Sequence, residues 1–154
     1  TGNITPLAEY NLWADAEAAH IVLEAGLPLT FIGWDACRGD CMLTAPHIEA
    51  LRSMSALGRF LMDVNMPLIE MNKRRFGTAC LDLADPAAMA AVLDPTCMRT
   101  YGPYHCEIDL SNGPGYGNLI IDRRQSSKGA RNACVCTELH AERYFALLTE
   151  AMRF

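Results

Sequence analysis

Residues 15–34 read DAEAAHIVLEAGLPLTFIGW, and this stretch decides the fold class. Asp15 is suited to cap a helix, and the apolar residues after it recur at helical spacing up to Gly26, a residue type that often ends helices. The run LPLTFIGW at 27–34 is continuously apolar and has the length of a strand, which is typical of a strand covered on both faces. A helix that leads directly into such a strand predicts an α/β protein with a parallel sheet.

The segments that follow extend this prediction. Helical spacing predicts helices near 45–54 and over 55–76, and Pro67 should kink or divide the second one. ADPAAMAAVLDP at 84–95 begins with an Asp-Pro pair, which predicts a helix with Asp85 at its N-cap.

The spacing of apolar residues changes near the C-terminus. Runs of strand type occupy 105–110, 117–124 and 133–139, with the turn sequences SNGPGYG and SSKGARN between them, and an amphipathic helix closes the chain at 140–152. We therefore expect part of an open, mostly parallel (Rossmann-like) sheet flanked by helices, with a C-terminal β-hairpin region and a final helix.

Composition excludes some classes of partner. The 154 residues fit one ordinary domain, and with 51% hydrophobic and 20% charged residues the chain should be globular. A net charge of −5, with NKRR at 72–75 as the one basic cluster, argues against a nucleic-acid partner. No apolar run approaches the roughly 18–20 residues that a membrane span needs, so no membrane partner is expected. We expect a cytoplasmic protein.

The chain contains seven cysteines. Their spacing matches no paired CxxC zinc array, and free thiols in a reducing cytosol are the favoured interpretation. A redox or metal-binding role for Cys37 and Cys41 remains as an alternative.

The N-terminal stretch GNITPLAEYNLWAD at 2–15 is unusually polar for a segment that leads into an apolar helix. Asn3, Glu9 and Asn11 lie in this loop, and loops at the carboxyl ends of parallel strands are where such sheets bind ligands. One carboxylate and two amides can bind vicinal hydroxyls, because each hydroxyl both donates and accepts a hydrogen bond. The alternative is that the same side chains only cap turns and helix ends.

The Asp85-Pro86 pair also allows two interpretations. Asp before Pro is an ordinary helix start, and the pair recurs at Asp94-Pro95. A carboxylate at a helix start beside an open pocket is also a suitable ligand for a hard cation such as Ca²⁺.

Two stretches resemble a known family. GNITPLAEYNLWADAEAAHIVLEAGLPLTFIGWD at 2–35 closely resembles the G-N-x-T-P-x-A-E-[FY]-N-x-x-x-D-x-E-A-A segment of the nucleoside hydrolases of the inosine-uridine type. DLADPAAMAAVLDP at 82–95 is similar to a later motif of that family, and the sequence from 120 to 152 resembles its closing strands and helix. The resemblance covers essentially the whole chain.

The resemblance implies a function and a set of site residues. The family hydrolyses the N-glycosidic bond of ribonucleosides with the help of a bound Ca²⁺, giving ribose and a free base. By this analogy Asn3 and Glu9 bind the 5′-hydroxyl side of the sugar, and Asn11 binds the ribose diol near the metal. Asp85 ligates Ca²⁺ and contacts the 3′-hydroxyl. A ribonucleoside substrate, a role in nucleoside salvage and a homo-oligomer are implied as well.

The chain departs from the family pattern in one large respect. The D-x-D-x-x-x-D-D cluster, which supplies most of the metal-binding carboxylates in the family, does not occur in this sequence. We therefore expect residues 1–154 to be the C-terminal portion of a single nucleoside hydrolase domain, with an N-terminal half of the same protein as its partner. Alone, the chain should be inactive and should expose an apolar sheet edge.

A second departure concerns the group that protonates the leaving base. The best-known members have His directly before the metal-binding aspartate, where this chain has Ala84. A non-catalytic nucleoside- or ribose-binding relative is therefore an alternative, and an N-terminal nucleophile hydrolase acting through Thr1 is a more remote one. Other candidates are named for their residue type alone: His20, His47, His105 and His140 as acids, and Trp13 and Trp34 for stacking on a base.

Overall fold

The computed structural model describes residues 2–126 and 129–153. The chain divides into two compact units, one formed by Thr1–Asp35 with Thr100–Thr137, the other by Ala36–Arg99 with Glu138–Phe154. Thr1, the basis of the N-terminal nucleophile alternative, lies outside the described residues. Within the described ranges, no helix has both the length and the apolar character needed to cross a membrane.

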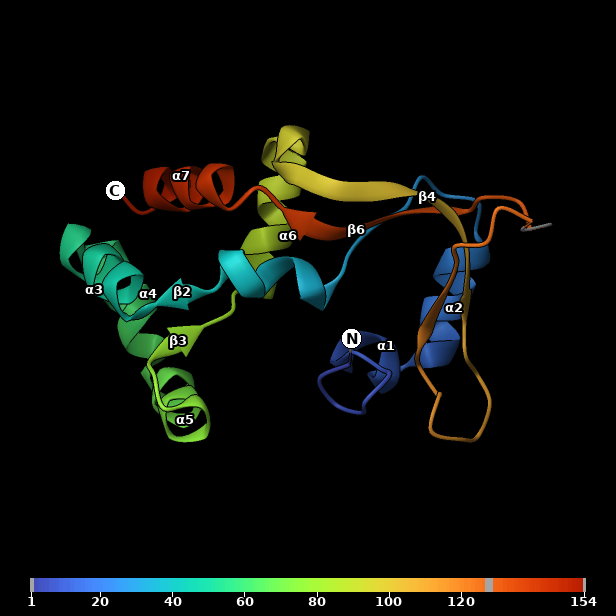
Figure 1. The fold of residues 1–154 in the computed structure, drawn as a ribbon, viewed down its shortest axis with the longest axis horizontal. Coiled ribbons are helices and arrows are strands. Elements are labelled where there is room, and N and C mark those ends of the chain that lie inside the picture. The colour runs from blue at the N-terminus through green and yellow to red at the C-terminus, as the bar shows by residue number, and fades with distance from the viewer. Residues whose placement is uncertain (1, 127–128, 154) are drawn as a thin grey trace. The chain divides into compact units, whose positions relative to one another are not determined.

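The first unit is built on a four-stranded sheet with the order β1-β6-β4-β5 (Figure 1). The strand β1 runs parallel to β6, with Phe31 opposite Val135, and β4 runs antiparallel to β5, with Cys106 opposite Ile121. The strands and helices of this sheet and its cover are α1 (Tyr10–Ala14), α2 (Ala16–Glu24), β1 (Thr30–Ile32), β4 (Met98–Ile108), β5 (Leu119–Asp122) and β6 (Ala133–Leu139). The α/β class and the C-terminal β-hairpin region are confirmed.

Helix α2 forms where the sequence predicts it and packs against the sheet. The Ala18 N–H donates to Asp15 Oδ1 at 2.8 Å, which confirms the predicted cap, and Gly26 ends the segment with φ +70°. Ala16 and Leu23 on α2 are buried against strand residues such as Cys106 and Val135, which forms the core of this unit.

The expected strand 27–34 is shorter than predicted. Only Thr30–Ile32 forms strand, and none of these three residues is fully buried. The register with β6 pairs only Thr30–Ile32 with Cys134–Cys136. Leu27 and Thr30 are exposed, so the run is not covered on both faces by the described residues.

The second unit is mainly helical. Its strands β2 (Leu43–Thr44) and β3 (Cys80–Leu81) form a short antiparallel pair. Three of its connecting segments are short 3₁₀ turns. The remaining elements are η1 (Trp34–Cys37), η2 (Gly39–Cys41), α3 (Ala45–Met54), α4 (Ala56–Val64), α5 (Met66–Phe76), α6 (Ala84–Leu93), η3 (Pro95–Cys97) and α7 (Ala141–Ala151).

The predicted helix 55–76 is divided, as expected from Pro67. Helix α4 ends at Val64, and α5 begins at Met66 with Pro67 in its first turn, where a missing N–H breaks no helical bond. The final helix is tied to this pair, because Ser55 Oγ accepts from Gly58 N–H at 2.9 Å and donates to the Met152 carbonyl at 2.6 Å.

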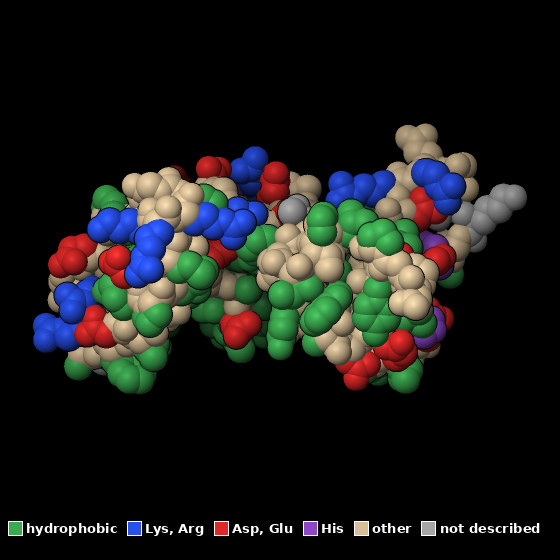
Figure 2. Space-filling view, turned by 90° about the horizontal axis from the view of Figure 1, so that it is seen from below, with side chains coloured by type: hydrophobic (Ala, Val, Ile, Leu, Met, Phe, Trp, Pro, Cys, Tyr) green, Lys and Arg blue, Asp and Glu red, His purple; other side chains and the backbone are tan. Residues whose placement is uncertain are grey.

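Large apolar side chains lie on the surface of both units. The most exposed include Val92 and Leu93 on α6, Ile21 on α2 and Phe60 on α4, at 63–73% exposure. Figure 2 shows apolar side chains exposed among charged ones in the view that it draws. Exposed apolar surface of this kind is where contact with further polypeptide can form.

Candidate functional site

The loop before α1 folds back on the start of that helix. The Tyr10 N–H donates to Asn3 Oδ1 at 2.8 Å, although the two residues are seven positions apart. Glu9 is the N-cap of α1, and its Oε2 accepts from the Asn11 N–H at 2.9 Å. Backbone N–H groups from Asn3 to Thr5 converge on the carbonyl of Ala8, which is fully buried. The loop therefore brings the three predicted sugar-binding residues to one small region.

Each capping bond uses only part of a side chain. Asn3 retains its NH₂ group and Glu9 retains Oε1, while no hydrogen bond involves the side chain of Asn11 within the described part of the chain. Asn3 and Asn11 are exposed and Glu9 is half-buried. The capping interpretation is correct for one oxygen of Asn3 and one of Glu9, and it leaves two donors and two acceptors available to a ligand.

Asp85 lies in the first turn of α6, and its predicted place as N-cap is wrong. The N-cap is Leu83, whose carbonyl accepts the Ala87 N–H at 3.1 Å. The helix can begin before Pro86 because the first N–H groups of a helix have no intrahelical acceptor to lose. The correction matters for function. Asp85 is not occupied with capping, is exposed, and forms no ion pair with any described residue.

The second Asp-Pro pair behaves as predicted. Asp94 is the N-cap of η3, and its Oδ1 accepts from the Thr96 N–H at 2.9 Å. That bond and the one from the Thr96 hydroxyl hold the pKa of Asp94 below its usual value. The two Asp-Pro pairs therefore differ. Asp94 is engaged in local structure, whereas the carboxylate of Asp85 is available to a ligand.

A further carboxylate was not predicted from the sequence. Asp82 is half-buried between β3 and α6, close enough to Cys37 to raise the pKa of that thiol, although burial of the thiol is the larger cause.

The cysteines show no sign of reactivity. All seven are free thiols, and burial raises the pKa of Cys37 to about 12 and raises that of Cys41 as well. The thiolate is the reactive form, so such thiols are poor nucleophiles at neutral pH. No group of three or more His, Cys, Asp or Glu able to hold a metal occurs among residues 2–126 and 129–153. The alternative of a redox or metal role for Cys37 and Cys41 gains no support.

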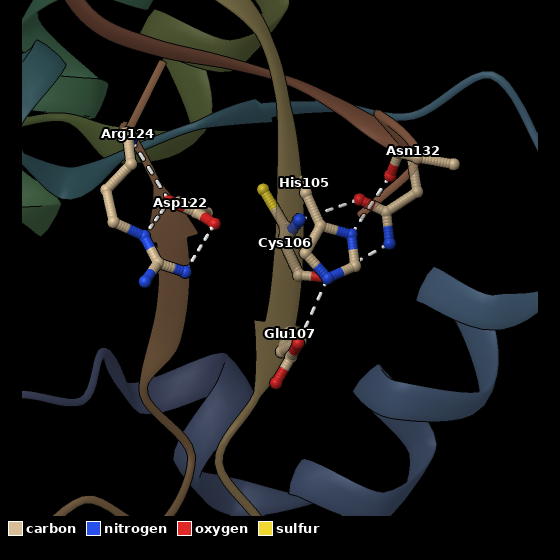
Figure 3. Close-up of polar contacts among 7 residues, drawn as sticks. His105, Cys106, Glu107, Asp122, Arg124 and Asn132 are labelled. Carbon is tan, nitrogen blue, oxygen red and sulfur yellow. Dashed lines mark hydrogen bonds and ion pairs between the residues drawn. The ribbon is translucent and has the colours of Figure 1, made fainter. Parts of the chain in front are cut away.

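Two of the candidate histidines are engaged in local structure. His47 completes a capping box with Thr44 at the start of α3, and its ring lies 4.6 Å from that of Phe145. His105 Nε2 lies 3.0 Å from Glu107 Oε1 and its Nδ1 lies 2.9 Å from the Ala130 carbonyl (Figure 3). The contact with Glu107 and then that with Ala130 raise the pKa of His105. These contacts give both rings a structural role.

The β4–β5 region contains a hollow that includes His105 but none of Asn3, Glu9, Asn11 and Asp85. It has a volume of about 970 Å³ and is lined by residues such as His105, Glu107, Asp122 and Arg124. Four of its charged or titratable side chains are paired, since Arg124 donates twice to Asp122 at 2.8 Å and His105 contacts Glu107 (Figure 3). Arg123 also lines the hollow, and its guanidinium lies 6.0 Å from the centre of the Tyr104 ring. We prefer the N-terminal loop as the candidate site, because there polar groups remain without partners.

The predicted site residues belong to different units. Asn3, Glu9 and Asn11 lie in the first unit and Asp85 lies in the second. The structure brings the first three together, and a common site with Asp85 stays a prediction. Ala84, the first residue of α6, is exposed and offers no proton.

Comparisons with known proteins agree with one another. A family model described as inosine-uridine preferring nucleoside hydrolase matches residues 1–146. The putative pyrimidine-specific ribonucleoside hydrolase RihB of Shigella boydii is 27% identical over 153 residues, covering 99% of this chain and 63% of that protein. The pyrimidine-specific ribonucleoside hydrolase RihB of Escherichia coli O157:H7 is 26% identical, covering 99% and 49%.

Solved structures give the same result for the fold. A purine-preferring ribonucleoside hydrolase from Gardnerella vaginalis matches with a TM-score of 0.80 at 25% identity, covering 99% of this chain and 49% of that one. A plant nucleoside hydrolase matches with a TM-score of 0.86 at 24% identity, covering 99% and 50%. The chain thus spans between 49% and 63% of the length of these relatives.

Proposed function

Because the chain belongs to the family of inosine-uridine preferring nucleoside hydrolases, we propose that it contributes to a site that hydrolyses ribonucleosides. The reaction would break the N-glycosidic bond with water and give ribose and the free base. The supporting observation is the set of polar groups on Asn3, Glu9 and Asn11 that local capping leaves available, within the segment that resembles the family motif. The relatives named above differ in their stated base preference, so the proposal concerns ribonucleosides as a class.

The N-terminal loop would hold the sugar. The Asn3 NH₂ group can donate to a hydroxyl oxygen while Glu9 Oε1 accepts the hydroxyl proton, and we assign this pair to the 5′-hydroxyl. The Asn11 amide can do both to the ribose diol. The loop is already fixed by its backbone bonds to Ala8, so little ordering is required when the sugar binds.

The carboxylates would also favour the reaction electrostatically. Cleavage of a ribosyl bond passes through an oxocarbenium-like state in which positive charge develops on the sugar. Glu9 and Asp85 are negative groups in fixed backbone settings, at a helix N-cap and in a first helical turn. Groups held in place before the reaction stabilise such charge without reorganisation.

A divalent metal fits the chemistry of the residues present, but only in part. We propose Ca²⁺ with Asp85 as one ligand, because an exposed carboxylate with no other partner suits a hard cation. When bound, the metal would lower the pKa of the attacking water and orient it. Ca²⁺ takes about six to eight oxygen ligands, and the described residues offer no cluster that could supply them. We propose that a segment equivalent to the remaining length of the relatives supplies the others.

A second candidate function follows from Ala84. A methyl group cannot protonate a leaving base, so a protein that binds nucleosides or ribose without cleaving them fits the same loop. The two candidates differ in turnover and share the sugar contacts. Binding of ribose with no release of base would identify the second.

The test is a base-release assay with uridine and with inosine, with and without a calcium chelator. It should be run on the 154 residues alone and on the chain joined to the remaining half of a homologous hydrolase. We expect Ca²⁺-dependent release from the joined protein and none from the 154 residues alone. Turnover by the isolated chain, or turnover that a chelator leaves unchanged, would contradict the proposal.

A further inference from the structure

The helix that carries Asn11 is short, and its own side chains contribute little to holding it in place. Helix α1 has five residues and no fully buried side chain. A helix this short does not form by itself in water, because nucleation costs more than its few hydrogen bonds return. Leu12 packs partly against the core of the first unit, and the remaining support must come from neighbouring segments.

The turn between β4 and β5 supplies that support through Gly117. Gly117 is buried, and its φ is +77°, a conformation that side chains with a Cβ rarely adopt. A Cβ at this position would lie 2.6 Å from Trp13 Cα, 3.0 Å from Trp13 N and 3.1 Å from the Leu12 carbonyl oxygen. These atoms are all backbone atoms of α1, which cannot rotate away as a side chain can. The turn therefore packs directly on the helix backbone.

The turn itself is firmly tied to the strands that flank it. The Gly117 N–H donates to the Asp109 carbonyl at 2.8 Å, and the Asp109 N–H donates to the Asn118 carbonyl at 3.0 Å. The antiparallel ladder continues directly from Ile108 opposite Leu119. A contact with Gly117 is thus a contact with the sheet.

The neighbouring residue reaches the next helix. The Tyr116 hydroxyl donates to Glu17 Oε2 at 2.6 Å, in the first turn of α2. This bond raises the pKa of Tyr116. Asp15 is both the C-cap of α1 and the N-cap of α2, so the two helices follow one another directly. The turn contacts both of them, α1 through Gly117 and α2 through Tyr116.

We propose that Gly117 and Tyr116 are positioning residues for the proposed sugar site. They would set the orientation of α1, and through it the placement of Asn11 and of the Glu9 cap, from about a hundred positions away in the sequence. The identity of the ligand in this inference rests on the proposed function. The contact between the turn and α1 is independent of it. A shift of about 1 Å in a substrate-binding group can cost up to about a hundredfold in rate, so packing at this level matters for activity.

The matched pair of variants is Gly117→Ala and Gly77→Ala. Gly77 has the same φ of +77°, and a Cβ at that position would meet nothing within 4 Å, so it carries the backbone strain without a contact to α1. The protein to be measured is this chain joined to the remaining half of a homologous hydrolase, called here the nucleoside-cleaving protein. Amide hydrogen exchange of its residues 9–14 reports whether α1 is formed, whatever the activity. We expect Gly117→Ala to speed exchange in this segment by at least about tenfold and to leave the β4–β5 ladder protected. Gly77→Ala should leave exchange in residues 9–14 as in the wild type.

Kinetics with uridine and inosine give the second readout. We expect Gly117→Ala to raise KM by at least about tenfold, because the sugar contacts are displaced. Tyr116→Phe should raise it by a smaller factor, and Glu17→Gln, which keeps an acceptor for the hydroxyl, should stay near the wild type. Unchanged exchange in residues 9–14 would overturn the inference, as would equal loss of protection in α1 and the ladder. If the wild type releases no base, the proposed function fails, and the exchange result still decides the inference.

Discussion

At the scale of single residues, the side chains of the candidate site use some of their polar atoms for local structure and leave others available. Asn3 Oδ1 and Glu9 Oε2 cap the start of α1, whereas the Asn3 NH₂ group and Glu9 Oε1 remain available. Replacement of Asn3 or Glu9 would therefore disturb the helix as well as the sugar contacts. Asn11 and Asp85 give cleaner tests, because their side chains support no local structure among the described residues.

The first prediction concerns Asp85→Asn. The change keeps the size of the side chain and removes its charge, so we expect the calcium content to fall and kcat/KM to drop by at least about a hundredfold. Metal analysis and base-release kinetics measure the two effects. Asp94→Asn is the matched control, because Asp94 caps η3 and should affect only stability. Full turnover by Asp85→Asn would show that the assignment is wrong.

The second prediction concerns Asn11→Ala. Asn11 is exposed in α1, and Ala is the better helix former, so the free energy of unfolding should change by less than about 0.5 kcal/mol. The loss of contacts to the ribose diol should lower kcat/KM by about tenfold to a hundredfold. Asn112→Ala, at an exposed position in the β4–β5 turn, serves as control. Equal effects of the two variants on kcat/KM would refute the role of Asn11.

Sequence reasoning named the candidate site residues by type and did not predict the residues that contact α1. The polar loop stood out because Asn3, Glu9 and Asn11 interrupt an apolar neighbourhood. Gly117 and Tyr116 could not be found in this way, since their importance comes from contacts with Trp13 and Glu17 about a hundred positions away. The spacing of residues within a short segment does not predict contacts with distant parts of the chain.

At the scale of elements, caps and proline positions determined the helices. The predicted boundaries of α2, α3 and α7 hold to within about two residues, which is the usual uncertainty of helix ends. The strand at 27–34 was predicted too long. An apolar run indicates which residues favour burial, but the length of a strand is set by how many residues of the neighbouring strand pair with it. The Asp85 cap was misplaced because a first helical turn also accepts Pro86.

The third prediction tests the cap of α2. Asp15→Ala removes the acceptor of the Ala18 N–H, and we expect the free energy of unfolding to fall by about 1 kcal/mol. Asp15→Ser keeps an acceptor and should recover most of the loss. Urea unfolding followed by circular dichroism measures both. Equal stability of Asp15→Ala and the wild type would mean that the cap contributes nothing.

The fourth prediction concerns pH and the β4–β5 region. Contacts with Glu107 and the Ala130 carbonyl raise the pKa of His105 above its unfolded value of about 6.5. Stability from this source is therefore fully present below about pH 6.5 and is lost as the pH rises through the folded pKa. Asp122 also faces His105, and its charge is paired with Arg124.

The variant His105→Gln tests this directly. It should be less stable than the wild type near pH 5.5, and the difference should be smaller near pH 8.5, because this stabilisation is lost as the pH rises through the folded pKa. Urea unfolding at the two pH values measures the difference. A stability difference that does not change with pH would argue against the assigned charge state.

At the scale of the whole molecule, the exposed apolar surface and the incomplete set of metal ligands both favour contact with further polypeptide. Large apolar side chains are exposed on α2, α4 and α6, and β1 is an edge strand of its described sheet. The metal-binding cluster of the family is absent from this sequence. Both features fit a chain that functions together with further polypeptide, and the chain spans between 49% and 63% of the length of its relatives.

We propose above all that the carboxylate on α6 and the N-terminal loop bind one and the same ribose. Mn²⁺ accepts oxygen ligands as Ca²⁺ does, and its unpaired electrons broaden nearby NMR signals, so it can replace Ca²⁺ as a probe. With Mn²⁺ bound to the nucleoside-cleaving protein, we predict that the side-chain amide signals of Asn3 and Asn11 broaden strongly and that Asp85→Asn abolishes the effect. Sharp signals from both amides while Mn²⁺ binds through Asp85 would contradict the account.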